Sequence, residues 1–414
     1  MVSISDIIFF VITFLAVYVQ IFFLVTFIEN RKKLVTRRSQ IKLKSYPAVT
    51  VIVPCWNEET TIYKTVKSLL SLNYPKDKIK ILLIDDGSTD HTWEVIQQFS
   101  EYSNIKIFHK ENGGKHTALN FGLLHTDTEF VGCLDADSLV HTESLVRIMS
   151  YFEEDKDTMA VVPSVVVYNP KTLIQKAQAF EHYMTVFMRK MHGFLGAVAV
   201  LPGPFSIYKK KVFNDLGLFR EAYNVEDTEM AYRMHKNHYK IDDCNDAYVY
   251  TVMPPTVMKL YRQRLRWIYG IINNIIDYRD VILKKKYGDF SMIVVPSAVI
   301  FMLSALCMFI VGIYHLLNFL FIKIMSLTTT GAHVFSNSNN FDTFFIPNHS
   351  SFIIIIFMYS FIILVSTLGR KIVEDRWVIS FDAIYFFLVF SILAPFWLIR
   401  AVYNTLLSKK PVWR

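Results

Sequence analysis

The sequence predicts an α/β domain built on a mostly parallel, doubly wound sheet and flanked by transmembrane α-helices. Apolar residues make up 52% of the 414 residues and charged residues only 19%, against about 45–50% and about 25% in average globular chains. Long uncharged segments stand at both ends of the chain, whereas the middle alternates short apolar runs with segments of helical periodicity. This composition excludes a disordered, collagen-like or disulfide-framework protein.

The first candidate span covers residues 7–28, which hold no charged residue over 22 positions. As a helix this segment would be roughly 33 Å long, enough to cross a bilayer. The alternative is a cleaved signal peptide, whose apolar region is usually about 7–15 residues long and follows basic residues. Here the only early charge is Asp6. We therefore expect a retained anchor and assign residues 1–29 to it.

The C-terminal region, residues 291–414, is expected to contain about three transmembrane helices. Residues 291–322 carry no charge and are too long for one upright helix but too short for two, which predicts one tilted span plus an interfacial segment. Residues 351–368 and 378–399 are two further candidates. Asp382 in the last of them is costly in lipid, so we expect it to face protein or water.

The net charge of +8 is concentrated beside the first span. Residues 31–44 contain seven Lys and Arg side chains and no acid, whereas residues 324–350 contain no Lys or Arg. This asymmetry predicts that the first stretch is cytoplasmic and the second external. Four spans then put both termini outside, but the basic tail argues against this count, so three or five spans stay open. Anionic lipid headgroups explain the basic stretch better than nucleic acid does, and we expect no nucleic-acid partner.

The middle of the chain alternates strands and helices. Three apolar, β-rich runs each end in a polar cluster, at residues 48–53, 79–84 and 130–134. Helical spacing is found between them, at residues 60–72 and 92–102. This order predicts a parallel sheet covered by helices, whose ligands bind beyond the carboxyl ends of the strands. The four cysteines show no CxxC spacing, so we expect reduced, buried thiols and no zinc site.

The second strand run ends in the motif Asp-Asp-Gly-Ser at residues 85–88. Two adjacent carboxylates are costly unless they bind something, and the hydroxyls of a ribose and the imide N–H of a nucleotide base suit them. The alternative is a tight turn at Gly87, with Ser88 or Asp90 as the cap of the next helix.

Two further polar segments are weak signals by themselves. Asn57 and Glu58 follow the first run, where an ordinary helix cap is the plainer interpretation. Gly113, Gly114 and Lys115 open another predicted helix and would form a phosphate or ribose cradle, although the spacing of a Walker A motif is absent.

The third run ends in Asp135-Ala136-Asp137. Positions i and i+2 point the same way on an extended chain, and two hard oxygen ligands side by side suit Mg²⁺ or Mn²⁺. An isolated DxD is common, but one that ends a buried strand about 50 residues after DDGS is more informative.

Glu226 and Asp227 precede a predicted helix at residues 228–237. Carboxylates at this position can simply complement the helix dipole. The functional interpretation is that one of them acts as a general base on an attacking hydroxyl.

The last motif is Gln263-Arg264-Leu265-Arg266-Trp267. Gln263, Arg266 and Trp267 share one face of a helix, a face that can hold a diphosphate and stack on a sugar ring. Arg264 and Arg262 are expected to point elsewhere, toward lipid headgroups. An amphipathic surface helix is the plainer alternative.

Together and in this order, DDGS, DAD, ED and QxxRW resemble the motifs of processive family 2 glycosyltransferases, which include synthases of cellulose, chitin, hyaluronan and poly-N-acetylglucosamine. The resemblance covers roughly residues 47–290. Residues 261–267 are most similar to bacterial poly-N-acetylglucosamine synthases, whereas residues 201–208 (LPGPFSIY) resemble hyaluronan and chitin-oligomer synthases. These two segments disagree on the product.

The resemblance implies a GT-A fold and an inverting transfer from a UDP-sugar, within a cytoplasmic domain of a multi-pass plasma-membrane protein. Residues 30–250 would be the catalytic domain and residues 251–290 amphipathic interface helices. The implied roles are uridine binding by Asp86 and Glu58, nucleotide support by Lys115, Mg²⁺ or Mn²⁺ binding by Asp137 with Asp135, the general base Asp227, and substrate contacts by Gly203, Gln263, Arg266 and Trp267.

The expected activity is polymerisation of a β-linked polysaccharide from UDP-N-acetylglucosamine, with UDP-glucose as the next candidate donor. The implied partners are the UDP-sugar, the growing glycan and the bilayer. Because the membrane region is small, an export or accessory subunit is a further expected partner. The nearest rival is a non-processive transferase that forms a polyprenyl-phosphate sugar or glycolipid. More distant rivals are a nucleotide-binding channel or sensor and a glycoside hydrolase.

Overall fold

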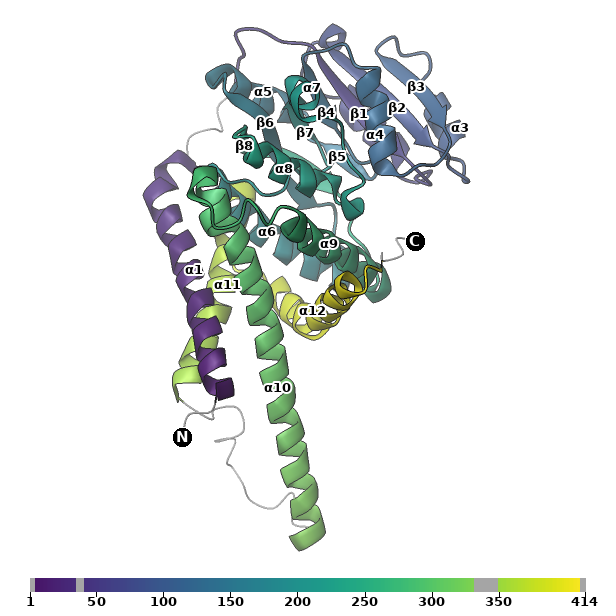
Figure 1. Ribbon diagram of the computed structural model, residues 1–414. Helices are drawn as coiled ribbons and strands as arrows, with labels where there is room; N and C mark the ends of the chain where they lie inside the picture. The colour runs from purple at the N-terminus through teal and green to yellow at the C-terminus, as the bar shows by residue number, and fades with distance from the viewer. Residues whose placement is uncertain (1–3, 35–40, 331–348, 410–414) are drawn as a thin grey trace.

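The computed structural model describes residues 4–34, 41–330 and 349–409. Figure 1 shows a sheet domain at one end of the molecule and long helices that extend away from it. Eight strands form one sheet in the order β3-β2-β1-β4-β7-β6-β8-β5. Their bounds are β1 Val49–Cys55, β2 Ile79–Asp86, β3 Ile105–Lys110, β4 Phe130–Cys133, β5 Ser138–Val140, β6 Thr158–Val167, β7 Ser206–Lys209 and β8 Lys240–Thr251.

The sheet is mixed but mostly parallel, as expected, since β6 and β8 in its second half also pair parallel. Strands β3, β2, β1 and β4 are parallel, as the βαβ alternation predicted. Strand β7 then pairs antiparallel with both β4 and β6, and β5 pairs antiparallel with β8. The doubly wound half therefore ends at β4, and later strands close the other half of the sheet.

Helices cover both faces of the sheet. Helices α2 (Ile62–Leu70), α3 (Thr92–Gln97) and α5 (Ser144–Glu154) pack on one face, and α4 (Lys115–Leu124), α7 (Lys211–Leu216) and α8 (Glu226–Lys236) pack on the other. Alternate residues of β1 supply the two cores: Val49, Val51 and Val53 face the first, and Ile52 faces the second. This period-2 burial is what a central strand requires.

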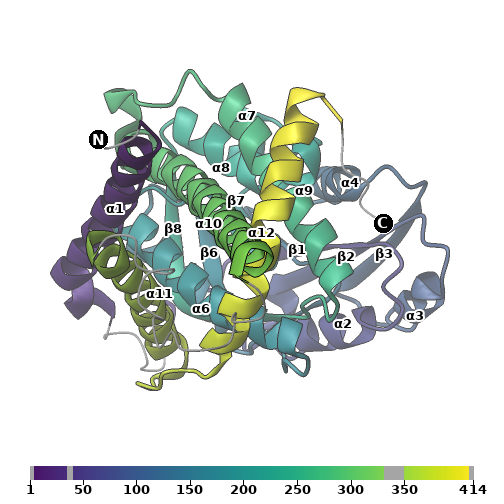
Figure 2. The ribbon, with the colours of Figure 1, turned by 90° about the horizontal axis from the view of Figure 1, so that it is seen from below.

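Two long helices lie between the sheet domain and the apolar helices. They are α6 (Leu173–Phe194) and α9 (Val257–Asp277). Helix α6 packs against α1 (Ile4–Leu34), α11 (His349–Glu374) and α12 (Asp382–Leu406), and α9 packs against α12. Seen from below, α6 lies among the apolar helices rather than at the edge of the domain (Figure 2).

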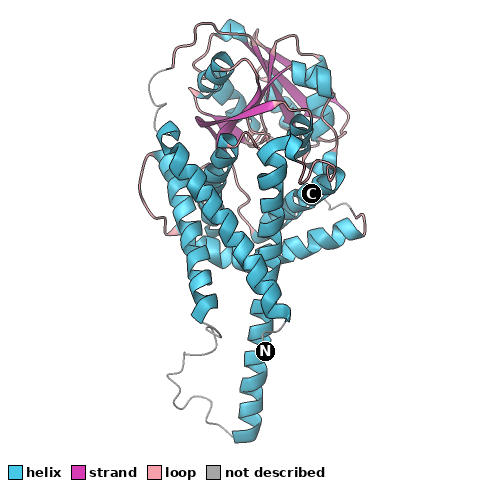
Figure 3. Ribbon diagram, turned by 60° about the vertical axis from the view of Figure 1, so that its left-hand side comes forward, coloured by secondary structure: helices cyan, strands magenta, loops and turns pink. Residues whose placement is uncertain are grey.

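Four helices of the described residues are long and apolar enough to cross a membrane, at Ile7–Leu34, Phe290–Met325, Ile356–Glu374 and Asp382–Leu406. They match the four predicted segments. Residues 291–322 do not form a span plus a separate interfacial segment, because one continuous helix, α10 (Val295–Thr330), follows a short π-helical turn, η4 (Phe290–Val294). Figure 3 shows α10 extending farthest from the sheet. Part of the basic stretch, residues 35–40, lies outside the described residues.

Local differences from the sequence-based expectations are few. The edge strand β3 was not predicted, and α3 ends at Gln97, before the predicted residue 102. Asn57 and Glu58 do not cap a helix, because α2 begins at Ile62 after the cap residue Thr61. Cys55, Cys133 and Cys244 are buried free thiols as expected, whereas Cys307 is partly exposed.

Candidate active site

The loops that follow β1 and β2 are joined to each other at the carboxyl edge of the sheet. Asn57 adopts a left-handed conformation, with φ 55°. Its backbone N–H donates to Ser88 Oγ at 3.0 Å, and its side-chain carbonyl accepts from the backbone N–H of Thr89 at 2.8 Å. The neighbouring Glu58 N–H donates to Thr92 Oγ1 at 2.7 Å. The first two motifs therefore form one structural unit.

Asp86 is buried and holds the glycine loop. It accepts from Lys110 Nζ at 2.5 Å and from the backbone N–H groups of Gly113 and Gly114 at 3.2 and 2.9 Å. Gly114, at φ 90°, is the residue before α4. These two N–H groups thus point at a carboxylate of the protein, so the loop is held in place by Asp86 instead of presenting an open phosphate cradle.

Lys115 joins three of the predicted site segments. Its ammonium group lies 2.7 Å from Asp135 Oδ1 and 3.1 Å from Glu226 Oε1. Burial acts to lower the pKa of Lys115, but Asp135 and Glu226 outweigh it, so the pKa is raised and the lysine stays charged. Gly203 lies against this pair: a Cβ there would be 2.6 Å from Lys115 Nζ and 2.9 Å from Asp135 Oδ1.

The DxD motif lies in the turn between β4 and β5, not on an extended strand as predicted. The turn is closed by a hydrogen bond from the Ser138 N–H to the Asp135 carbonyl oxygen at 3.1 Å. Burial, followed by the charges of Asp135 and Glu58, raises the pKa of Asp137 to about 7. Glu58 is therefore near enough for its charge to act on Asp137.

This carboxylate group fits a hard divalent cation. A bound cation would favour the ionised form of Asp137 against the burial and the carboxylate charges that raise its pKa, and oxygen ligands are what Mg²⁺ and Mn²⁺ prefer. Asp137 would be the principal ligand, since Asp135 is already paired with Lys115. The residues described include no set of three or more His, Cys, Asp or Glu side chains arranged to hold a metal, so other ligands would come from the donor and water.

Glu226 and Asp227, the first residues of α8, differ in their charge environment. Burial acts to raise the pKa of Glu226, but Lys115 outweighs it and the pKa is lowered. For Asp227, burial and the charge of Glu226 raise the pKa to about 6, against the opposing effects of Lys115 and Arg266. Asp227 is the better proton acceptor of the two, because its conjugate acid is the weaker acid.

The QxxRW helix, α9, faces this region. Arg266 Nη1 donates to the carbonyl oxygen of Asn224 at 2.5 Å, three residues before Asp227. Gln263 Oε1 is buried without a hydrogen-bond partner. The prediction that Arg264 meets lipid headgroups is wrong: it is 7% exposed, pairs with Glu181 at 2.5 Å and stacks 4.4 Å from the centre of the Trp267 ring.

The structure thus brings Glu58, Lys115, Asp135, Asp137, Gly203 and Asp227 together and places Arg266 beside Asp227. Sequence reasoning missed Lys110, the partner of Asp86, and His109, which contacts the buried Asp85 at 2.6 Å. The available signal was the alternation of Ile105 and Ile107 with polar residues, which indicates the edge strand that carries both.

The mixed sheet, with carboxylates in the loops that follow its strands, is a fold of the GT-A type. Residues 50–217 match the family model described as "Glycosyl transferase family 2". This match covers less than half of the chain, and it makes residues 50–217 similar to that family.

Among curated proteins, the chain is similar to two poly-beta-1,6-N-acetyl-D-glucosamine synthases. One from Staphylococcus epidermidis is 30% identical over 224 residues, which is 54% of each chain. One from Staphylococcus aureus strain COL is 29% identical over 236 residues, 56% of this chain and 57% of the relative. The matches span about half the length of these relatives.

Among solved structures, the fold resembles a mannosyltransferase from Pyrobaculum calidifontis in complex with GDP-Man and Mn²⁺. The TM-score is 0.61 at 17% identity, and the superposition covers 96% of this chain and 99% of that one. This likeness shows that the GT-A domain and the arrangement of its flanking helices form a known fold.

Proposed function

We propose that the chain polymerises N-acetylglucosamine from UDP-N-acetylglucosamine into a β-linked polysaccharide at a membrane. The observation that carries the proposal is the geometry of Asp227, a base with a raised pKa that lies beside Arg266 and shares Lys115 with the DxD carboxylates. The similarity to poly-N-acetylglucosamine synthases supports the choice of sugar. The QxxRW face of α9 supports chain extension over single-sugar transfer.

The reaction is a single displacement at the anomeric carbon, with inversion. Asp227 accepts the proton of the acceptor hydroxyl as that oxygen forms the new glycosidic bond. The bond from the anomeric carbon to the β-phosphate oxygen breaks, and UDP leaves with its negative charge. Arg266 and Lys115 supply positive charge to that leaving group. A Mg²⁺ or Mn²⁺ ion at Asp137 and Asp135 would add Lewis-acid stabilisation of the diphosphate.

The remaining assignments belong to the same proposal. Gln263, Arg266 and Trp267 bind diphosphate and acceptor, and Gly203 lies under the donor. Asp86 acts on uridine through the glycine loop that it holds, and Glu58 supports the metal side of the site. The catalytic domain at residues 30–250 faces the cytoplasm, with interface helices at 251–290 and an anchor at 1–29.

A panel of nucleotide sugars tests the proposal. The purified full chain in detergent is offered UDP-N-acetylglucosamine, UDP-glucose or GDP-mannose with Mg²⁺ or Mn²⁺, and nucleotide release is measured. We expect UDP release from UDP-N-acetylglucosamine, products longer than single-sugar adducts on a sizing gel, and loss of release in excess EDTA. Turnover that survives EDTA would contradict the metal assignment.

The Asp227→Asn variant tests the base. Release of UDP should fall by about 10²-fold or more, while the affinity for UDP stays close to that of the wild type.

The product of the wild-type reaction distinguishes the two kinds of transferase. Single-sugar polyprenyl-phosphate adducts would favour the non-processive alternative.

A further inference from the structure

Helix α12 is long and apolar enough to cross a membrane, but its direction differs from that of the other apolar helices. Seen from below, α12 runs across the underside of the molecule, whereas α10 points toward the viewer (Figure 2). Composition cannot separate a spanning helix from one that lies between protein and lipid, since both are apolar on every side. The contacts made by the two ends of α12 distinguish these arrangements.

The first turns of α12 lie against the start of α6, which is fastened to the sheet domain. The rings of Phe386 and Phe180 have centroids 5.1 Å apart, and Lys176 Nζ lies 5.8 Å from the centre of the Tyr385 ring. The same part of α6 donates from Gln178 Nε2 to the carbonyl oxygen of residue 254, just after β8, at 2.9 Å. The beginning of α12 is therefore one helix away from the sheet domain.

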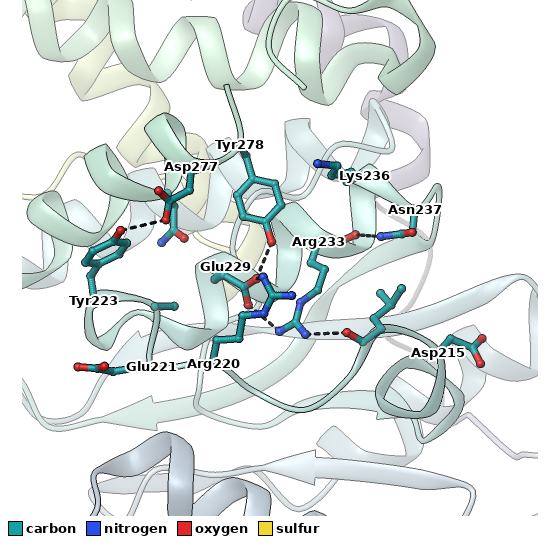
Figure 4. Close-up of a pocket in the computed structure, with 13 residues that line it drawn as sticks. Asp215, Arg220, Glu221, Tyr223, Glu229, Arg233, Lys236, Asn237, Asp277 and Tyr278 are labelled. Atoms are coloured by element: carbon teal, nitrogen blue, oxygen red, sulfur yellow. Dashed lines mark hydrogen bonds and ion pairs between the residues drawn. The ribbon is translucent and has the colours of Figure 1, made fainter. Parts of the chain in front are cut away.

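The last turn of α12 is also close to the sheet domain, through α9. Thr405 Oγ1 accepts from Asn273 Nδ2 on α9 at 3.1 Å. Directly after α9, the Tyr278 hydroxyl donates to Glu229 of α8 at 2.5 Å, in the cavity between α8 and α9 (Figure 4). Residues 385–405 of the helix extend about 30 Å, the thickness of the hydrocarbon core. If α12 crossed the bilayer, one end would lie that far from the domain, whereas both ends are one helix away from it.

The side of α12 that points away from α6 and α9 is an apolar stripe. Its residues recur every three or four positions, so they share one face of the helix, and they are 45–78% exposed. The stripe consists of Ile384, Leu388, Ile392, Phe396, Ile399, Tyr403 and Leu406. The opposite face, with Phe390, Leu398 and Ala401, is buried in a cluster that also holds Leu265 and Tyr269 of α9. Helix α12 therefore separates α9 from whatever covers the stripe.

Lipid is the occupant that fits the stripe. The stripe continues the exposed apolar surface of α10, because Phe396 and Phe309 meet with their ring centroids 5.8 Å apart. Before α12, Trp377 is exposed, and Lys371 Nζ lies 5.7 Å from the centre of its ring. Arg400, in the last two turns, is exposed as well. Aromatic and basic side chains of this kind are enriched where lipid headgroups meet the hydrocarbon.

We propose that α12 lies along the bilayer, within the leaflet next to the sheet domain, with its apolar stripe in contact with lipid. Among the described helices, α1, α10 and α11 are then the spans, and Lys409 lies on the same side of the membrane as the sheet domain. Residues 31–44 and 409–414, both rich in Lys and Arg, thus share one side, as the distribution of positive charge in membrane proteins favours. A helix in contact with lipid supports α9, which carries Arg266 and Trp267.

Depth-dependent fluorescence quenching tests the direction of α12. The full chain is placed in vesicles of phosphatidylcholine and phosphatidylglycerol, with a bimane label on one introduced cysteine and bromine at a shallow or a deep position of the lipid chains. Cys307→Ser removes the partly exposed thiol, and the other three cysteines are buried. The labelled positions are Ile384→Cys, Ile392→Cys and Leu406→Cys on the stripe. The ratio of shallow to deep quenching should agree within about twofold among them, because all three lie at one depth.

The matched control is the same label along α10, at the exposed positions Leu303→Cys, Ile313→Cys and Leu320→Cys. Here deep quenching, relative to shallow quenching, should be about threefold stronger at the middle position than at the outer two, since α10 crosses the bilayer. The same profile on α12 would overturn the proposal. Absence of quenching by either lipid along the stripe would also overturn it, since protein, such as a second copy of the chain, would then cover the stripe.

Labelling of intact cells tests the position of residue 409. Lys409→Cys and Glu101→Cys, an exposed position of the sheet domain, are each placed in the Cys307→Ser background and treated with a membrane-impermeant maleimide before and after permeabilisation. We expect the two cysteines to react under the same condition. Opposite labelling would show that α12 crosses the membrane. Neither measurement uses a sugar donor, so both are independent of the proposed function.

Discussion

At the scale of single residues, the two neighbouring carboxylates at the start of α8 differ in pKa because their charged partners differ. Lys115 lies 3.1 Å from Glu226 and keeps its pKa low, whereas Asp227 is left with a raised pKa of about 6. Pairs of titratable groups pushed apart in this way mark acid and base roles. One residue thus anchors the lysine, and the next is available for proton transfer.

The first prediction concerns the pH dependence of catalysis. The base must be ionised, so kcat/KM for UDP release should fall tenfold per pH unit below about pH 6. Glu226→Gln removes the negative charge that raises the pKa of Asp227, and should move this limb to lower pH. Rates from pH 5 to 8.5 measure both profiles. A flat wild-type profile down to pH 5 would show that Asp227 is not the titrating base.

The second prediction concerns stability. The pKa of Asp227 is raised from 3.8 to about 6 by folding, so its ionisation destabilises the fold above about pH 6, and this penalty disappears as the pH falls toward 4. Asp227→Asn should therefore raise the free energy of unfolding at pH 8 by on the order of 1–3 kcal/mol. The melting temperature at pH 8 should rise with it. The gain should vanish near pH 4. Equal melting temperatures at pH 8 would refute a destabilising carboxylate.

The third prediction concerns Gly203. A methyl group at this position displaces Lys115 or Asp135, both of which are side-chain ends that can move. Gly203→Ala should lower kcat/KM by about tenfold or more and change the melting temperature little. The matched control is Gly312→Ala, whose added carbon meets nothing within 4 Å. Near-wild-type activity of Gly203→Ala would remove Gly203 from the site.

At the scale of elements, the contact between α6 and α9 decides how Trp267 is held. Glu181 on α6 pairs with Arg264 on α9, and the Arg264 guanidinium stacks on the Trp267 ring. Burial raises the pKa of Glu181, and Arg264 opposes this effect. Helix α6, which carries none of the predicted motifs, thus positions Trp267 through the Glu181–Arg264 pair.

The fourth prediction tests that contact. Arg264→Leu leaves the partly buried Glu181 without its partner, which should cost on the order of 1–3 kcal/mol and lower the melting temperature by a few degrees. The double variant Glu181→Leu/Arg264→Leu should recover most of this stability, because no unpaired charge remains. UDP release should stay low in both, since Trp267 loses its stacked cation. Recovery of activity with stability would show that the pair is only structural.

At the scale of the whole molecule, the apolar helices and the sheet domain are joined through α6. Helix α11 approaches α6 so closely that a Cβ on Gly369 would lie 1.8 Å from the backbone carbonyl oxygen of Tyr183. Beside this point, the Tyr183 hydroxyl bonds Glu374, which in turn pairs with Arg370 at 2.8 Å. The apolar helix α11 therefore packs directly on α6, the helix whose Glu181 pairs with Arg264.

The fifth prediction follows from this close approach. Gly369→Val must push α11 away from the α6 backbone, since a backbone carbonyl cannot rotate aside as a side chain can. The melting temperature in detergent and the rate of UDP release should both fall. Gly312→Ala in α10 again serves as the control, and unchanged activity of Gly369→Val would mean that α11 does not support the catalytic domain.

Most of the architecture could be predicted from the sequence, because local signals produce it. Uncharged segments mark the spans, period-2 runs mark the central strands, and the motif residues follow strand ends. Strand β7, which pairs antiparallel with β4, and strand β8, which pairs parallel with β6, escaped prediction because their pairing is long-range. The protein partners of Asp86, Lys110 and the Gly114 N–H, escaped prediction because they are 24 and 28 residues away.

The sequence by itself determined a similarity to family 2 glycosyltransferases, the apolar helices on either side of the α/β domain, and the candidate carboxylates Asp135, Asp137 and Asp227. These follow from composition, periodicity and motif order, which are local properties of the chain. Only the tertiary structure decided that Arg264 is buried against Glu181, and that a cavity opens between α8 and α9. Burial and charge pairing depend on which distant segments meet, and that is settled when the whole chain packs.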